Sequence, residues 1–191
     1  MPREPALDIA ALSLTEIAKA LAEQRLPPVD QWNPSHCGDS EMRIARDGTW
    51  FHQGSPIGRK AMVQLFSTIL RREPDGSYVL VTPGEKLDIA VEDAPFVAVE
   101  VKSEGAGATR RLAFRLNTDE IVIAGPLHPL RFTLRDDGPH PYLRVRGDAL
   151  RPLDALINRS VYYELVNLAL EEGNEPPALW SDGQLFGLAP A

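Results

Sequence analysis

The sequence has little cysteine and no long apolar segment, and both absences narrow the class of protein. Cys37 is the one cysteine in 191 residues, which excludes an intramolecular disulfide framework and a zinc site built from several cysteines. The apolar runs are far shorter than the roughly 20 residues of a membrane-spanning helix. Residues 1–8 have no apolar segment behind a basic stretch, so we expect no secretory signal. We therefore expect a soluble protein of the bacterial cytoplasm, with no membrane partner.

Motifs for metal binding and catalysis are also missing. The chain has no HExxH, no paired cysteines, no GxSxG elbow and no Walker loop. His36, Cys37, Asp39 and His52 are a weak set of metal ligands, because no metal-site spacing relates them. The sequence therefore predicts no metal site and no catalytic residue, and it identifies no cofactor.

The balance of charge is acidic, with one basic stretch. The chain has 27 acidic and 20 basic residues and a net charge of −7, whereas a protein that binds duplex nucleic acid is usually basic. Nucleic acid is therefore a possible partner that the net charge does not support. The exception is the segment 41–75, whose cations are Arg43, Arg46, Arg59, Lys60, Arg71 and Arg72. The charged residues outside this segment are typical of a mixed, solvated surface.

Turn signals and periodicity predict the elements. Ser13 and Glu16 have the spacing of a capping box at the start of a helix that ends near Arg25. We expect a second helix with Ser55 as its cap, Pro56 as its first residue and its end near Arg72. A third is expected over 153–171. Alternating or apolar runs predict strands at 42–46, 49–52, 78–81, 86–91, 96–102, 110–116, 121–123, 130–134 and 142–145, and a hairpin at 179–186.

The two longer helices match at an offset of 100 residues. Identical residues at this offset are Ile57 and Ile157, Arg59 and Arg159, Leu65 and Leu165, and Leu70 and Leu170. Chance similarity between two amphipathic helices is the alternative to duplication. We predict an α+β fold of two related strand–helix–strand units, with antiparallel sheets each packed by one long helix. Residues 1–30 would hold an N-terminal helix and linker, 31–94 the first unit and 95–191 the second.

The predicted start of the second helix has the features of an anion site. A helix N-terminus offers unpaired N–H groups and a partial positive charge, and Arg59 and Lys60 add cations there. Gly58 is a poor helix former that would permit a ligand to approach closely. The alternative is structural: Ser55 is only a cap and Arg59 pairs with a carboxylate.

Other candidate ligand-binding residues lie elsewhere in the sequence. Trp50, His52 and Tyr78 could stack on a planar ring, although aromatic residues on strands usually belong to the core. Arg43 belongs to the basic stretch, and Lys86 follows a polar turn from which it could reach a phosphate. Arg159 could complete a site between the two units or form a structural ion pair.

Several longer motifs resemble those of a known family. They are Cys37-Gly38-Asp39, Asp47-Gly48-Thr49-Trp50, Gly54-Ser55-Pro56-Ile57-Gly58-Arg59, the run 78–86 and the run 91–96. Together they resemble domain-of-unknown-function family 1285 of proteobacteria over residues 29–188. The resemblance implies a duplicated α+β fold whose C-terminal half is a partly open barrel like a pleckstrin-homology domain. It also implies a ligand site at the interface of the two units, suited to a nucleotide-like or nucleic-acid-like ligand, and a role in signalling. It brings no catalytic residue.

These observations predict a non-enzymatic ligand-binding module. The ligand would be an anionic, nucleotide-like small molecule bound at the interface of the two units. The alternative is a protein-interaction adaptor that uses exposed sheet edges and binds no small ligand. An unrecognised hydrolase or transferase is a third reading, and homodimerisation through strand edges is open as well.

Overall fold

The computed structural model describes residues 13–23 and 25–189. The chain divides into two compact units: unit 1 comprises 1–24, 98–143 and 157–191, and unit 2 comprises 25–97 and 144–156. Each unit therefore combines segments that are separated in the sequence. The predictions made for residues 1–8 lie outside the described range.

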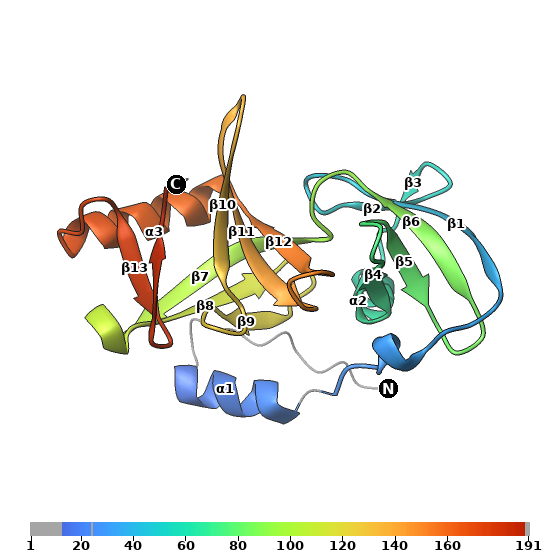
Figure 1. Cartoon of the computed structure of the whole chain (residues 1–191), viewed down its shortest axis with the longest axis horizontal. Helices are drawn as coiled ribbons and strands as arrows, with labels where there is room; N and C mark the ends of the chain where they lie inside the picture. Colours follow the sequence, from blue (N-terminus) through green and yellow to red (C-terminus); the bar gives the residue numbers. More distant parts are fainter. Residues whose placement is uncertain (1–12, 24, 190–191) are drawn as a thin grey trace. The chain divides into compact units, whose positions relative to one another are not determined.

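The first sheet belongs to unit 2 (Figure 1). Its strands are β1 (Cys37–Ile44), β2 (Trp50–His52), β3 (Ser55–Pro56), β4 (Leu70–Arg72), β5 (Tyr78–Val81) and β6 (Lys86–Val91). Their order in the sheet is β3-β2-β1-β6-β5-β4. β1 and β6 run parallel, from Cys37 opposite Lys86 to Ile44 opposite Val91. The prediction of a wholly antiparallel sheet was therefore wrong for this central pair.

The second sheet has the same number and order of strands. They are β7 (Phe96–Glu104), β8 (Arg111–Leu116), β9 (Ile121–Ile123), β10 (Leu130–Arg135), β11 (Gly138–Arg146) and β12 (Leu153–Ile157). The order β10-β11-β12-β7-β8-β9 again puts the first and last strands side by side in the middle. β13 (Ala178–Ser181) and β14 (Gln184–Gly187) form the predicted hairpin as a separate two-stranded sheet. The described chain is thus mostly β, with two similar six-stranded sheets and few helices.

The second helix begins later than the sequence predicts. Ser55 and Pro56 form β3, and α2 spans Lys60–Thr68. The cause is a two-residue turn: Gln53 and Gly54 both have positive φ, 49° and 79°, as hairpin turns with the twist of a sheet require. His52 therefore pairs with Ser55, and Ser55 is not a helix cap. The predicted end of this helix near Arg72 was also wrong, because Leu70–Arg72 is β4.

The third helix also begins later, with consequences for the proposed repeat. Leu153–Ile157 is the buried strand β12, and α3 spans Arg159–Glu171. Asn158 is the cap, and its side chain accepts a hydrogen bond from the Val161 amide at 2.9 Å. α2 lies between the third and fourth strands of its sheet, whereas α3 follows the sixth of its own. Arg59 and Arg159 therefore do not occupy equivalent positions, although the strand orders agree.

The predicted N-terminal capping box is present. Ser13 donates from its amide to Glu16 Oε2 at 2.8 Å, and the Glu16 amide donates to Ser13 Oγ at 3.3 Å. The backbone hydrogen bond from Ser13, followed by the one from its hydroxyl, lowers the pKa of Glu16. In α1 (Leu14–Glu23), Leu14 and Ile17 pack into a buried cluster with Ala113 and Ile121 of the second sheet. Unit 1 therefore holds the predicted helix by apolar contacts.

Candidate functional site

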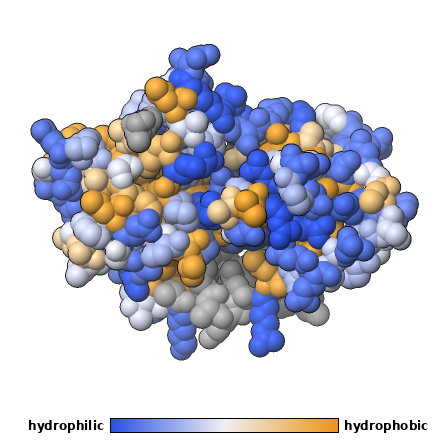
Figure 2. All heavy atoms as spheres, in the orientation of Figure 1, coloured by the Kyte–Doolittle hydropathy of each residue, from blue (hydrophilic) through white to orange (hydrophobic). Residues whose placement is uncertain are grey.

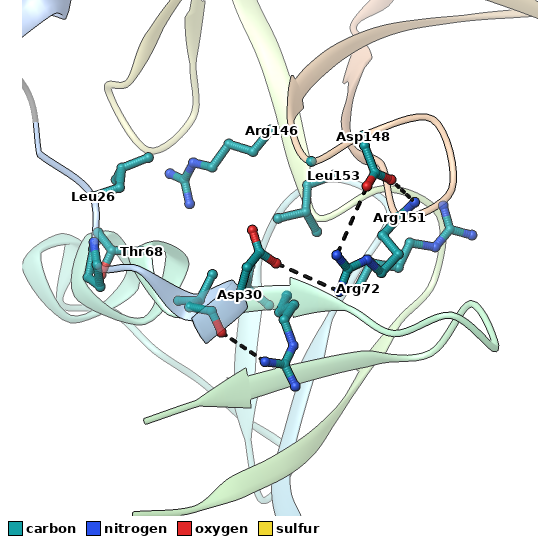
Figure 3. A pocket seen from close by; sticks show the side chains of 13 residues that line it. Leu26, Asp30, Thr68, Arg72, Arg146, Asp148, Arg151 and Leu153 are labelled. Atoms are coloured by element: carbon teal, nitrogen blue, oxygen red, sulfur yellow. Dashed lines mark hydrogen bonds and ion pairs between the residues drawn. The ribbon is translucent and has the colours of Figure 1, made fainter. Parts of the chain in front are cut away.

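A cavity of about 240 Å³ lies within unit 2. The residues before the 3₁₀ turn η1 (Val29–Gln31) form one side of it, and the end of α2 with β4 forms another. Residues between 146 and 153, which connect β11 to β12, complete it. Figure 3 shows Leu26 and Thr68 at one end of the cavity, with Asp148 and Arg151 at the other.

Four arginines give the cavity its charge. Arg71, Arg72, Arg146 and Arg151 line it, against two lining carboxylates, Asp30 and Asp148. Since an arginine guanidinium stays protonated in proteins, the wall carries more positive than negative charge. This excess suits an anionic group, for which arginine offers paired N–H donors in a planar fork.

Arg71 is the buried member of this set, and its hydrogen bonds connect two segments of the cavity wall. Its side chain is 9% exposed and its Nε donates to Glu73 Oε1 at 2.6 Å. Nη1 donates to the main-chain oxygens of Val29 at 2.8 Å and Trp32 at 2.7 Å. These bonds tie β4 to η1, so Arg71 is a positioning residue for Val29 and Asp30 in the cavity wall.

Arg72 and Arg146 make main-chain contacts around the cavity. Arg72 Nη1 donates to the Pro152 oxygen at 3.4 Å, and its guanidinium lies 5.2 Å from the centre of the Tyr78 ring. Arg146 Nη1 donates to the Ser67 oxygen at 2.8 Å. Ser67 is in the last turn of α2, where unpaired carbonyl oxygens favour a cation. Main-chain oxygens therefore hold both guanidinium groups in place at the cavity.

Arg151 lies between the two carboxylates of the cavity. Its Nη1 is 3.8 Å from Asp30 Oδ1, and its Nη2 is 4.0 Å from Asp148 Oδ2. Asp148 accepts hydrogen bonds from the amides of Arg151 and Leu150, which lower the pKa of its carboxyl group. Asp148 is therefore ionised at neutral pH, and long, partly exposed ion pairs of this kind are weak.

We predict a pH dependence at Glu73, the carboxylate partner of Arg71. Burial raises the pKa of Glu73, but the hydrogen bond and charge of Arg71, with Lys86 at 3.4 Å, outweigh it and hold the pKa below the ordinary 4.5. A lowered carboxyl pKa stabilises the fold above the unfolded-state pKa, and this contribution is lost as the pH falls through the folded-state pKa. Glu73→Gln should therefore be less stable than the wild type at pH 7, with a difference that shrinks below about pH 4.

Urea denaturation at several pH values measures this effect. Glu85→Gln, which removes an exposed carboxylate from the turn before β6, is the control for the loss of one negative charge. A stability difference for Glu73→Gln that stays constant down to pH 3 would show that the ion pair with Arg71 contributes nothing.

The structure does not bring the sequence-predicted anion site together. Ser55, Gly58, Arg59 and Lys60 are exposed, and Arg59, the residue before α2, makes no side-chain capping hydrogen bond. A Cβ added at Gly58 would meet nothing within 4 Å, so no close packing explains this glycine. The predicted site depended on a helix start at Pro56, which is wrong.

The other predicted residues have separate surroundings. Arg43 pairs with Glu92 and lies over the Phe51 ring, and Lys86 pairs with Glu73. Trp50 is 1% exposed and stacks on Phe66 inside unit 2, so its position does not support stacking on a ligand. His52 is exposed on β2, and Arg159 belongs to unit 1. None of these residues lines the cavity.

Sequence reasoning missed most of the residues that do line it. Arg71 and Arg72 belong to the basic stretch but lie outside the predicted anion site, which also lacks Arg146, Asp148 and Arg151. One signal was available: Arg146-Gly147-Asp148 is a charged turn directly after a strand.

Among residues 13–23 and 25–189, no group of three His, Cys, Asp or Glu side chains could hold a metal ion. No helix of this range is long and apolar enough to cross a membrane.

Comparisons with known proteins identify the family. The model of the N-terminal domain of "domain of unknown function (DUF1285)" matches residues 27–94, and that of the DUF1285 C-terminal domain matches 95–188. No curated protein matches the chain. A crystal structure of a DUF1285 family protein from Silicibacter pomeroyi DSS-3 is 41% identical, with a TM-score of 0.76, over 95% of this chain and 97% of that one.

A second crystal structure is more distant. The DUF1285 family protein from Shewanella baltica OS155 is 27% identical, with a TM-score of 0.52, over 66% of this chain and 91% of that one. The matching segments begin and end close to the limits 29–188 over which the motifs show their resemblance. The chain therefore belongs to the DUF1285 family.

Proposed function

We propose that this protein is a non-enzymatic module that binds a small anionic ligand in the arginine-lined cavity of unit 2. The observation that carries the proposal is the convergence of four arginines and two aspartates on one cavity of about 240 Å³. Charge-assisted hydrogen bonds from arginine are roughly twice as strong as neutral ones. A phosphate or carboxylate is therefore the group that this cavity would select.

The volume of the cavity limits the size of the ligand. Pockets for drug-sized ligands span roughly 300–1,000 Å³, and this cavity lies just under that range. A single phosphate or carboxylate with a small body suits the volume better than a dinucleotide. A nucleotide-like ligand and a role in signalling stay part of the proposal, with a mononucleotide as the largest candidate.

Two finer statements about architecture also belong to the proposal. We infer that the two sheets arose by duplication, because their strand orders agree. The second sheet, followed by α3 at its end, would be the partly open barrel that the resemblance implies. The equivalence would then be between strands rather than between α2 and α3.

Calorimetry with inorganic phosphate, AMP and uncharged adenosine tests the binding proposal. Phosphate and AMP should bind and adenosine should not, because the phosphate supplies the charge. Arg151→Gln should weaken phosphate binding at least tenfold, about 1.4 kcal/mol. The side chain of Arg151 is 34% exposed, so the variant should fold normally.

Arg111→Gln is the matched control. Arg111 forms an ion pair with Asp182 at 3.2 Å in unit 1, and both side chains are 45% exposed. This variant changes the net charge equally but should leave phosphate binding unchanged. If both variants weakened phosphate binding equally, the effect would arise from overall charge. The absence of any anion binding would refute the proposed function.

A protein-interaction adaptor is the second candidate function. One observation favours it: β10 is the outermost strand of its sheet, and its Leu134 is 67% exposed. An unpaired strand edge can accept a strand from another protein. A stoichiometric partner that binds wild type and Arg151→Gln equally, but is lost in Leu134→Glu, would support this function.

A further inference from the structure

The cavity opens beside an apolar strip of α2 that the fold leaves exposed. On α2, Leu65 is 63% exposed and Met62 is 39% exposed. Leu26, which precedes η1 and lines the cavity, is 45% exposed. Figure 2 shows that apolar atoms reach the surface between hydrophilic side chains on the face in view. Single exposed apolar residues are normal in proteins, whereas a contiguous group beside a cavity marks a binding surface.

Helix geometry connects this strip to the cavity. Ala61, Leu65 and Thr68 have the spacing i, i+4, i+7 and therefore lie on one face of α2. Thr68 lines the cavity together with Leu26, and Figure 3 shows both on the same side of it. The strip from Ala61 through Leu65 therefore leads to the cavity at Thr68.

The hydroxyl group of Thr68 does not interrupt the strip. Its Oγ1 donates to the Leu65 main-chain oxygen at 2.7 Å, a local bond common for threonine within helices. With the hydroxyl group satisfied by the helix itself, the methyl group of Thr68 is the part that adds to the apolar strip. The apolar strip thus meets the cationic cavity at Thr68.

We propose that the ligand is an amphiphile: an anionic head group held by Arg72, Arg146 and Arg151, and an alkyl chain that lies along Leu26, Leu65 and Ala61. This inference rests on the proposed function and names the class of molecule that the cavity takes. The head group fills the cavity of about 240 Å³, so a longer chain leaves it at the end where Leu26 and Thr68 lie. A polar metabolite of the same charge would make no use of the exposed leucines.

Chain length provides the test. The probes are butanoate, octanoate below its micelle concentration, octan-1-ol and inorganic phosphate, each titrated by calorimetry. Octanoate has four more methylene groups than butanoate. Full burial of one methylene group raises affinity about 4-fold, so four groups that the strip half covers should tighten binding about tenfold. Octanoate should therefore bind about tenfold more tightly than butanoate, and octan-1-ol should not bind measurably.

Leu65→Gln separates the chain from the head group. This exposed substitution should abolish the tenfold gain of octanoate and leave the affinity for butanoate unchanged. Leu185→Gln, at a leucine that is 48% exposed on β14 in unit 1, is the matched control and should keep the gain.

The outcomes distinguish this inference from the proposed function. If phosphate and butanoate bind but octanoate binds no more tightly, the amphiphile is wrong and the anion site stands. A chain-length gain that persists in Leu65→Gln, or equal binding of octan-1-ol, would also overturn the inference. If no anion binds at all, both proposals fail.

Vesicles identify the source of the head group. Sedimentation with phosphatidylglycerol vesicles that is weakened by Leu65→Gln would support a membrane lipid as the ligand. Octanoate binding without such sedimentation would support a free amphiphile.

Discussion

Trp50→Ala is expected to lower the free energy of unfolding by about 4 kcal/mol, in the range found when a buried aromatic side chain is truncated. Trp50 is 1% exposed, and its ring stacks on Phe66 of α2 with centroids 6.4 Å apart and planes at 19°. The same side chain lies on β2, which pairs with β1. The substitution would therefore leave a cavity between α2 and its sheet.

Trp50→Phe separates loss of volume from loss of the indole group. The indole Nε1 is buried without a hydrogen-bond partner among the described residues, and an unsatisfied buried donor costs about 1–3 kcal/mol. Phenylalanine removes this cost while it leaves a smaller void. We therefore expect Trp50→Phe to lose less than about 1.5 kcal/mol.

Urea denaturation followed by circular dichroism measures both variants. His52→Ala, an exposed position two residues along the same strand, should change stability by less than about 0.5 kcal/mol. The competing view is that Trp50 stacks on a ligand. It would be supported if Trp50→Ala weakened anion binding at unchanged stability, and that result would contradict a role of Trp50 in packing against Phe66.

Strands with clear turns at both ends were predictable from the sequence. β5 and β6 have the predicted bounds Tyr78–Val81 and Lys86–Val91, because an Asp-Gly turn precedes them and a Thr-Pro-Gly turn separates them. β9, at Ile121–Ile123, also has the predicted bounds. In these segments the local signals and the tertiary structure agree.

The starts of α2 and α3 were not predictable from the same kind of signal. Pro56 and Pro152 each precede an apolar pattern, which favours the first position of a helix. Proline is equally compatible with an edge strand, as at Pro56, and with the residue before a strand, as at Pro152. The strand Leu153–Ile157 is short and apolar except for Asp154, and periodicity cannot distinguish so short a run from the start of a helix.

The cavity depends on tertiary structure that no local pattern reveals. Its residues come from three distant segments, 26–30, 68–72 and 146–153. The basic stretch pointed to the middle segment, but the exposed Arg59 and the buried Arg71 have the same appearance in the sequence. The difference between them arises because β4 packs on η1 and α2 begins at a surface.

Arg71→Met should lower the free energy of unfolding by about 3 kcal/mol. Removal of one partner from a buried, hydrogen-bonded ion pair typically costs about 3–5 kcal/mol. Here it would leave Glu73 without its bond at 2.6 Å and would deprive the carbonyl groups of Val29 and Trp32 of a donor. We use the lower end of the range because Lys86 continues to face Glu73 at 3.4 Å.

Arg59→Met is the matched control, since it removes the same charge and a side chain of the same type. Arg59 is exposed and makes no capping hydrogen bond, so its loss should change stability by less than about 0.5 kcal/mol. Urea denaturation of both variants gives the comparison. Equal stability of the two would show that burial and the three hydrogen bonds of Arg71 contribute nothing.

Hydrogen exchange connects the same substitution to the cavity. Because Arg71 bonds to the main chain of Val29 and Trp32, its loss should speed amide exchange over residues 29–32 before the sheet opens. The cavity wall formed by Val29 and Asp30 would then lose its fixed position, and phosphate affinity should fall although Arg72, Arg146 and Arg151 are unchanged. Arg71→Lys keeps the charge but not the planar fork that serves three acceptors, so it should restore little of the lost affinity. If Arg71→Lys restored both protection and affinity, the charge of Arg71 would matter rather than its hydrogen bonds, and its role as a positioning residue would be wrong.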